Sequence, residues 1–139
     1  MAIYLKFEGI EGTGTGKYNG WIELQSCQIA PERGTSNALA TITCTKFNDS
    51  SSPGIFSEAA GGSEKKATIV FVKGTEAPFL SVELEKAYIS AINVGRLHEK
   101  IMETFWLSFD KVSYTTSPTA ASKDPKDAKD KAMWNFFAK

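Results

Sequence analysis

The sequence predicts a mainly β fold: an antiparallel β-barrel or two-sheet sandwich with one short α-helix alongside. Apolar and polar residues alternate with period two in most segments, which is typical of half-buried strands. Clusters of turn-forming residues separate about seven such segments, a spacing that suits a barrel or sandwich. The sequence lacks a strand–helix–strand rhythm, which argues against a nucleotide-binding α/β domain.

The first two predicted strands flank a glycine-rich loop. Ile3, Leu5 and Phe7 alternate with polar neighbours and predict a strand near the start of the sequence. Residues 9–16 are rich in glycine, which permits turns because it adopts positive φ at little steric cost. Residues 21–29 alternate again and predict the second strand.

A third strand and a short helix follow. Turn formers fill residues 31–37, and residues 38–47 are dense in Thr and Ile, which suit a pleated surface. A helix is predicted over residues 52–60. Ser52 can cap it, Pro53 fits its first position, and a Gly-Gly pair stops it.

The second half of the sequence predicts three more strands. Residues 66–72 and 79–94 alternate, residues 95–100 form a turn, and residues 102–114 alternate again. Before Asp110 the alternating apolar residues occupy odd-numbered positions, and after it they occupy even-numbered ones. This change of parity, from one face of the strand to the other, predicts a β-bulge.

The C-terminal part is predicted to be a connector and a final strand. Residues 115–131 are polar, contain two prolines, and predict a solvated connector. Residues 132–138 are apolar and aromatic and predict a terminal strand. At 139 residues the chain has the length of one domain, so residues 1–139 are expected to form a single barrel.

Charge and hydropathy exclude several classes. Sixteen Lys and Arg balance sixteen Asp and Glu, so the basic footprint of a nucleic-acid binder is absent. The sequence starts without a basic region followed by an apolar one, and no window approaches the roughly twenty apolar residues of a membrane span. We expect a protein made in the cytoplasm, without membrane insertion, whose export would use no cleaved signal peptide.

Candidates for catalysis are few. Glu83 and Glu85 share one face of a predicted strand and could serve a hydrolase, although a solvated sheet face explains them better. His98 is the only histidine and lies among charged residues in a predicted turn, which favours a surface role. We predict no catalytic centre, no metal site and no cofactor.

The glycine-rich segment superficially resembles a phosphate-binding loop. That motif needs glycine where the chain has Glu11, and Ser or Thr where it has Tyr18. The segment after it also predicts a strand, whereas the motif needs a helix. A mobile loop with a role in interactions is the favoured interpretation.

The two cysteines are predicted to be free thiols. Cys27 shares parity with Glu23 and Gln25, whereas Cys44 shares parity with Ile42. If the register holds, the two side chains point to opposite faces. Cys44 is expected to be buried as a small apolar residue.

Two tryptophans are candidates for subunit contacts. Trp106 lies opposite the parity of Phe105, Leu107 and Phe109, on the nominally solvent-facing side of its strand. Either a neighbouring subunit or a second packed layer under the helix could cover it. The same two interpretations apply to Trp21, at the start of a strand.

As a whole the sequence resembles the Hcp family, the tube-forming proteins of bacterial type VI secretion. The resemblance rests on the following segments: residues 1–12, residues 17–24, residues 41–53, residues 79–94 with residues 105–109, and Met133–Asn135. It therefore spans nearly the full length.

The resemblance implies a barrel with a helix alongside, assembled as a homo-hexameric ring. Rings stack into a hollow tube, and a baseplate, a contractile sheath and a spike protein deliver it from the bacterial cytoplasm. The family is not enzymatic and can carry effectors in the lumen. The expected ring contacts are Trp106, Trp21, Gly12, Thr13, Gly14, Thr15, Gly16, Arg33 and Gly34. A small-molecule or sugar-binding β-barrel module remains the alternative.

Overall fold

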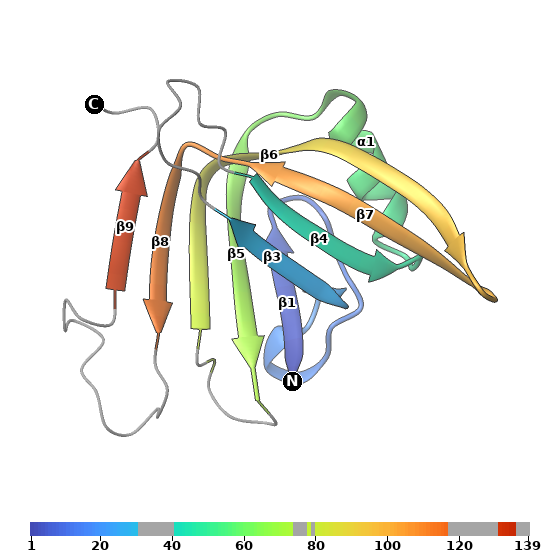
Figure 1. Cartoon of the computed structure of the whole chain (residues 1–139), viewed down its shortest axis with the longest axis horizontal. Helices are drawn as coiled ribbons and strands as arrows, with labels where there is room; N and C mark the ends of the chain where they lie inside the picture. Colours follow the sequence, from blue (N-terminus) through green and yellow to red (C-terminus); the bar gives the residue numbers. More distant parts are fainter. Residues whose placement is uncertain (31–40, 74–77, 79, 117–130, 136–139) are drawn as a thin grey trace.

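The computed structural model describes residues 1–30, 41–73, 78, 80–116 and 131–135 (Figure 1). The elements within these residues are β1 (Ala2–Phe7), the 3₁₀ turn η1 (Gly16–Tyr18), β2 (Ile22–Leu24), β3 (Ser26–Ala30), β4 (Thr41–Phe47), α1 (Ser52–Gly61), β5 (Lys65–Val72), β6 (Leu80–Leu97), β7 (Lys100–Ser108), β8 (Lys111–Thr116) and β9 (Lys131–Asn135).

The strands form two antiparallel sheets that share β6. The first sheet has the order β2-β1-β5-β6-β8-β9, and the second has the order β6-β7-β4-β3. Because β2 and β3 are consecutive, they also link the sheets at the far side. The predicted mainly β fold with one short helix is confirmed.

Strand β6 bends where it passes from the first sheet to the second. Lys86 adopts a φ of 52°, a left-handed conformation that a non-glycine residue rarely takes. Before the bend Val82 and Leu84 point inward, and after it Ala87 and Ile89 do. The bend therefore resets the parity so that both halves of the strand face one core.

The bulge predicted after Asp110 is instead a break between two strands. The chain leaves β7 in the second sheet at Ser108 and enters β8 in the first sheet at Lys111. At this break the backbone N–H of Asp110 donates to the carbonyl of Glu85, 3.0 Å away, on the bend of β6. The parity changes because a new strand begins, so the prediction of a bulge was wrong.

Helix α1 begins as predicted, but its cap differs. Ser51 is the N-cap residue, and Pro53 lies in the first turn. The hydroxyl of Ser52, the predicted cap, donates to the carboxylate of Glu103 instead. The helix faces the core through Ile55, which is fully buried.

The β6–β7 hairpin is longer than predicted. Strand β6 continues to Leu97 and β7 starts at Lys100, so His98 and Glu99 alone form the turn. His98 is exposed, in agreement with the prediction, and has a φ of 57°. Figure 1 shows this hairpin projecting away from the other strands.

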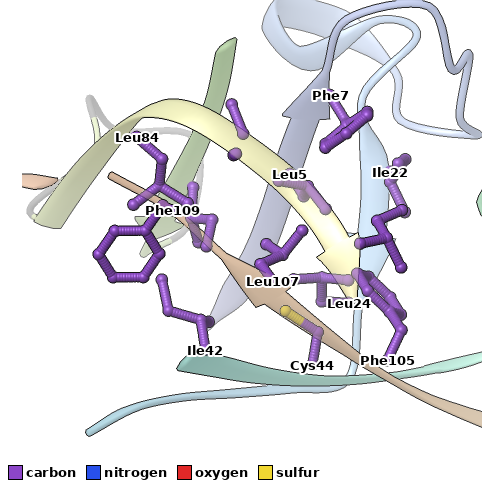
Figure 2. Close-up of a cluster of buried hydrophobic side chains, with 14 of the residues drawn as sticks. Leu5, Phe7, Ile22, Leu24, Ile42, Cys44, Leu84, Phe105, Leu107 and Phe109 are labelled. Atoms are coloured by element: carbon purple, nitrogen blue, oxygen red, sulfur yellow. The ribbon is translucent and has the colours of Figure 1, made fainter. Parts of the chain in front are cut away.

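The core lies between the two sheets (Figure 2), and Ile55 of α1 packs into it. Its fully buried apolar side chains include Leu5, Phe7, Ile22, Ile42, Cys44, Ile55, Ile69, Val82, Leu84, Phe105 and Leu107. Both sheets and α1 contribute, so the two sheets enclose a single apolar cluster.

The C-terminal connector lies mostly outside the described residues, as do residues 136–139. Within the described part, β9 pairs antiparallel with β8 and extends the first sheet at its edge. The terminal strand is thus present over Lys131–Asn135.

We expect Leu107→Ala to lower the free energy of unfolding by about 2–5 kcal/mol, because it opens a cavity in this core. The same substitution at Leu97, whose side chain is 53% exposed, should change it by less than about 0.5 kcal/mol. Urea unfolding followed by circular dichroism, at a concentration where the chain is monomeric, measures both. Similar losses for the two variants would contradict the described core.

Candidate assembly surfaces

The glycine-rich loop between β1 and β2 is held by backbone hydrogen bonds. The N–H of Gly12 donates to the carbonyl of Gly20 (2.7 Å), and the N–H of Gly14 donates to that of Trp21 (2.8 Å). The N–H of Gly20 returns a bond to the carbonyl of Gly14 (3.1 Å). The predicted mobile loop is therefore an anchored one.

Close backbone approach explains two of its glycines. A Cβ at Gly12 would overlap the carbonyl oxygen of Trp21, and one at Gly14 would overlap that of Tyr18. Thr13 and Thr15 alternate with these glycines and are exposed. The threonines, rather than the glycines, thus offer side chains to a partner. Gly16, at a φ of 65°, follows them at the start of η1.

Trp21 belongs to an aromatic cluster on the outer face of the first sheet. Its ring meets Tyr18 edge-on at 5.2 Å, and Tyr18 stacks on Tyr4 at 4.7 Å. The Lys6 ammonium lies 5.8 Å from the Trp21 ring centroid. Contacts within the subunit therefore account for the half-buried state of Trp21.

Trp106 is half-buried on the outer face of the second sheet. Its cross-strand neighbours are Thr43 on β4 and Ala91 on β6, both small side chains. Helix α1 packs toward the core through Ile55, on the same side as Phe105. Trp106 therefore lies on the opposite side of β7 from the surface that the helix joins.

The tip of the β6–β7 hairpin carries an exposed apolar patch that the sequence reasoning missed. Val94 is 52% exposed, Leu97 53% and Ile101 49%. The sequence does contain a sign of this patch: near the turn the apolar residues stop alternating and occur on both faces of the hairpin. Val94 and Ile101 lie on the face that carries Glu103, and Leu97 lies on the opposite face. These three residues, which surround the tip, are called the hairpin-tip patch below.

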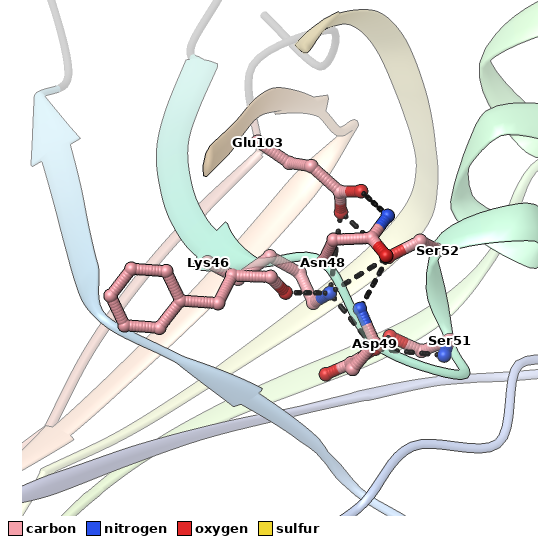
Figure 3. A network of polar contacts seen from close by, with 7 residues as sticks. Lys46, Asn48, Asp49, Ser51, Ser52 and Glu103 are labelled. Carbon is pink, nitrogen blue, oxygen red and sulfur yellow. Dashed lines mark hydrogen bonds and ion pairs between the residues drawn. The ribbon is translucent and has the colours of Figure 1, made fainter. Parts of the chain in front are cut away.

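Buried charges join β4, β7 and the start of α1 (Figure 3). The Lys46 ammonium, fully buried, lies 3.3 Å from a carboxylate oxygen of Glu103 and 2.9 Å from one of Asp49. Ser52 donates to one oxygen of Glu103 at 2.9 Å, and Asn48 donates to the other at 2.8 Å. Each buried charge thus has several partners, which offset its loss of hydration.

Sequence parity could have revealed this pair. Lys46 continues the inward parity of Ile42 and Cys44, and Glu103 continues that of Phe105 and Leu107. Opposite charges at core positions of two strands indicate a buried ion pair, because an unpaired charge there would be costly. Lys46 and Glu103 are also direct cross-strand partners.

The surroundings of Asp49 shift the pKa of its carboxyl group. Burial raises the pKa of Asp49, but hydrogen bonds from Ser51 and Lys46, together with the Lys46 charge, outweigh it. The pKa of Asp49 therefore lies below its ordinary value. The same carboxylate accepts the Ser51 N–H at 2.8 Å and so fixes the turn before α1.

The other candidates from the sequence lie apart. Glu83 and Glu85 are exposed on β6, and Glu85 is paired with Lys111 at 3.6 Å. Among the described residues, no group of three or more His, Cys, Asp or Glu could hold a metal ion. Nor does any helix in that part of the chain have the length and hydrophobicity to cross a membrane. Arg33 and Gly34 lie outside the described residues.

The sequence matches a known protein family, and the fold matches solved structures of type VI secretion proteins. The family described as Type VI secretion system effector, Hcp, matches residues 4–115. The chain is similar to the crystal structure of Hcp1 from Salmonella typhimurium, with a TM-score of 0.80 and 20% identity over 97% of this chain and 94% of that one. It is also similar to the crystal structure of Hcp2 from the same organism, with a TM-score of 0.78 and 20% identity over 98% of this chain and 96% of that one. The crystal structure of a type VI secretion system effector from Yersinia pestis is similar as well, with a TM-score of 0.79 and 15% identity over 96% of this chain and 98% of that one.

Among curated proteins, no relative matches. The family match covers most of the chain, and the chain therefore belongs to the Hcp family. It is a subunit of the type VI secretion tube, a component that oligomerises, as the resemblance predicted. The alternative of a sugar-binding module is not favoured.

We expect Lys46→Met to lower the free energy of unfolding by about 3–5 kcal/mol, because it leaves the Glu103 carboxylate buried without its cation. The double variant Lys46→Met with Glu103→Leu should recover much of this loss. Lys111→Met is the matched control, since its pair with Glu85 is exposed, and it should cost less than about 1 kcal/mol. Equal losses in Lys46→Met and Lys111→Met, measured by urea unfolding, would contradict a buried pair.

Asp49 should contribute to acid sensitivity. Its folded pKa is lower than its unfolded one, so its stabilising contribution is complete above the unfolded pKa and is lost as pH falls through the folded pKa. The free energy of unfolding of Asp49→Asn should therefore fall less steeply than that of wild type below about pH 5. Thermal unfolding across an acid pH series measures both slopes, and parallel curves would speak against this role.

Proposed function

We propose that this chain forms hexameric rings that stack into a hollow tube and carry effector proteins in the lumen. The baseplate, contractile sheath and spike protein of the secretion system would be its partners. The chain would be made in the bacterial cytoplasm and leave the cell without a cleaved signal peptide. Residues 1–139 would act as one domain, with no cofactor and no catalytic activity.

The observation that carries the proposal, beside family membership, is the hairpin-tip patch. Three apolar side chains, each about half exposed, project on a long hairpin. Exposed apolar side chains on both faces of a projecting tip can insert into a neighbouring copy of the same chain, which would cover both faces at once. A contact between the tip of one copy and a different face of the next is head-to-tail, which is the contact type that closes a ring.

Charge supports the same assembly. The formal net charge is zero, so copies packed around a ring and stacked along a tube would not repel one another strongly. The outer face of Trp106 and the exposed threonines Thr13 and Thr15 provide further contact surface. In this proposal Trp106 packs on a neighbouring subunit within the ring, and the threonine loop faces the next ring.

Leu97→Asp tests the proposal. A charge in the hairpin-tip patch would have to be desolvated in the ring, so the variant should shift from ring toward monomer while its monomer remains folded. Light scattering after size exclusion measures the mass, and negative-stain electron microscopy shows rings. Wild type should have six times the mass of one chain.

Ser63→Asp is the control matched in charge. Ser63 is exposed between α1 and β5, far along the chain from the hairpin, and this variant should keep the ring. A wild-type protein that stays monomeric at high concentration would overturn the ring. A ring that survives Leu97→Asp would remove the face of the hairpin tip that carries Leu97 from the interface.

A further inference from the structure

The structure corrects the predicted orientation of the two cysteines. Cys27 on β3 and Cys44 on β4 are direct cross-strand partners, so they point to the same face and not to opposite ones. The parity of β2 does not extend to Cys27, because the chain changes sheet at Gln25 between β2 and β3. Both thiols are free, and Cys44 is buried, as predicted.

Direct cross-strand partners have the separation that a disulfide needs. Opposed residues of an antiparallel pair have Cα atoms about 4.5–5.5 Å apart, within the roughly 4.4–6.8 Å range of disulfides. The Cys44 sulfur points into the core beside Leu107 and Phe105 (Figure 2). Cys27 packs against the same cluster from the neighbouring strand. A bridge could therefore form without rearranging the backbone.

The two thiols differ in access and acidity. Cys27 is half-buried on β3, which pairs with β4 alone within the described residues, whereas Cys44 is fully buried. A hydrogen bond with Cys44 lowers the pKa of Cys27 and outweighs its burial. The same hydrogen bond, burial and the Cys27 charge hold the pKa of Cys44 well above its ordinary value. Cys27 is thus the thiol suited to attack first, and Cys44 the one suited to resolve.

We propose that Cys27 and Cys44 are a redox-active pair that forms a reversible cross-strand disulfide by exchange with a low-molecular-weight disulfide. The Cys27 thiolate attacks one sulfur of that disulfide, whose S–S bond breaks and releases one thiol. Cys44 then attacks the Cys27 sulfur of the mixed disulfide and releases the second thiol. Two electrons and the two thiol protons pass from the protein to the small molecule, which leaves as two thiols.

The bridge would fasten an edge strand. β3 is joined to β4 by the backbone ladder and by the contact between the Ser26 and Thr45 hydroxyls. Edge strands are where a sheet opens most easily, so a covalent link at this position would reduce local opening. A reducing cytoplasm would keep the pair open and an oxidising exterior would close it. This last consequence rests on the proposed secretion of the tube, whereas the chemistry of the pair does not.

Purified full-length protein tests the proposal directly, without any secretion assay. The reduced protein is incubated with oxidised glutathione, quenched with acid, alkylated with a maleimide and analysed by intact mass and peptide mapping. Wild type should lose two hydrogen atoms, take up no maleimide, and yield a Cys27–Cys44 linked peptide. Its melting temperature should rise by about 10 °C on oxidation and return on reduction.

Single variants separate the two roles. Cys44→Ala should stop at the mixed disulfide and retain one glutathione on Cys27, whereas Cys27→Ala should retain none because Cys44 is buried. Wild type that keeps both thiols, or that retains one glutathione without closing the bridge, would overturn the proposal. If Cys44→Ala fails to fold, peptide mapping of wild type alone decides the outcome.

Discussion

Closing two sheets around one core requires strands to pass from one sheet to the other, and this constraint shapes the whole molecule. Apart from the crossing through α1 between β4 and β5, the chain passes at three short corners: Gln25 between β2 and β3, Lys86 within β6, and Phe109–Asp110 between β7 and β8. The last two corners touch, since Asp110 donates to the Glu85 carbonyl and its carboxylate lies 3.7 Å from the Lys86 ammonium. At each corner the side chains change which parity faces inward, so every strand can still bury one face.

The same corners decide how much could be predicted from the sequence. Within one strand the alternation located the core correctly, as for Leu5 and Phe7 in β1 or Phe105 and Leu107 in β7. Across a corner it failed, which is why the cysteines were assigned to opposite faces and a bulge was expected after Asp110. Composition likewise identified the glycine-rich loop but not its anchoring, because hydrogen bonds to residues near Trp21 depend on how the loop folds back.

The buried Lys46–Glu103 pair helps to attach the short helix α1 to the sheet. α1 has 10 residues and places a single large apolar side chain, Ile55, fully in the core, which is little to hold a helix of this length. Ser52 at its start is bonded to Glu103 on β7 and to the Lys46 ammonium on β4. An apolar pair of similar volume could stabilise the strands equally well, but it would not fix where the helix begins. The ion pair therefore fixes the position at which the helix begins.

These constraints explain how a fold can persist at 20% identity with a TM-score of 0.78–0.80. Most core positions require only an apolar side chain of the correct parity, and many residues meet that requirement. Specific residue types are needed where the backbone approaches itself, as at Gly12 and Gly14, or where a charge is buried, as at Lys46. The exposed positions on both faces of the hairpin tip, and the outward-facing position of Trp106, carry neither requirement. Their apolar side chains are therefore free to serve the proposed contact between chains.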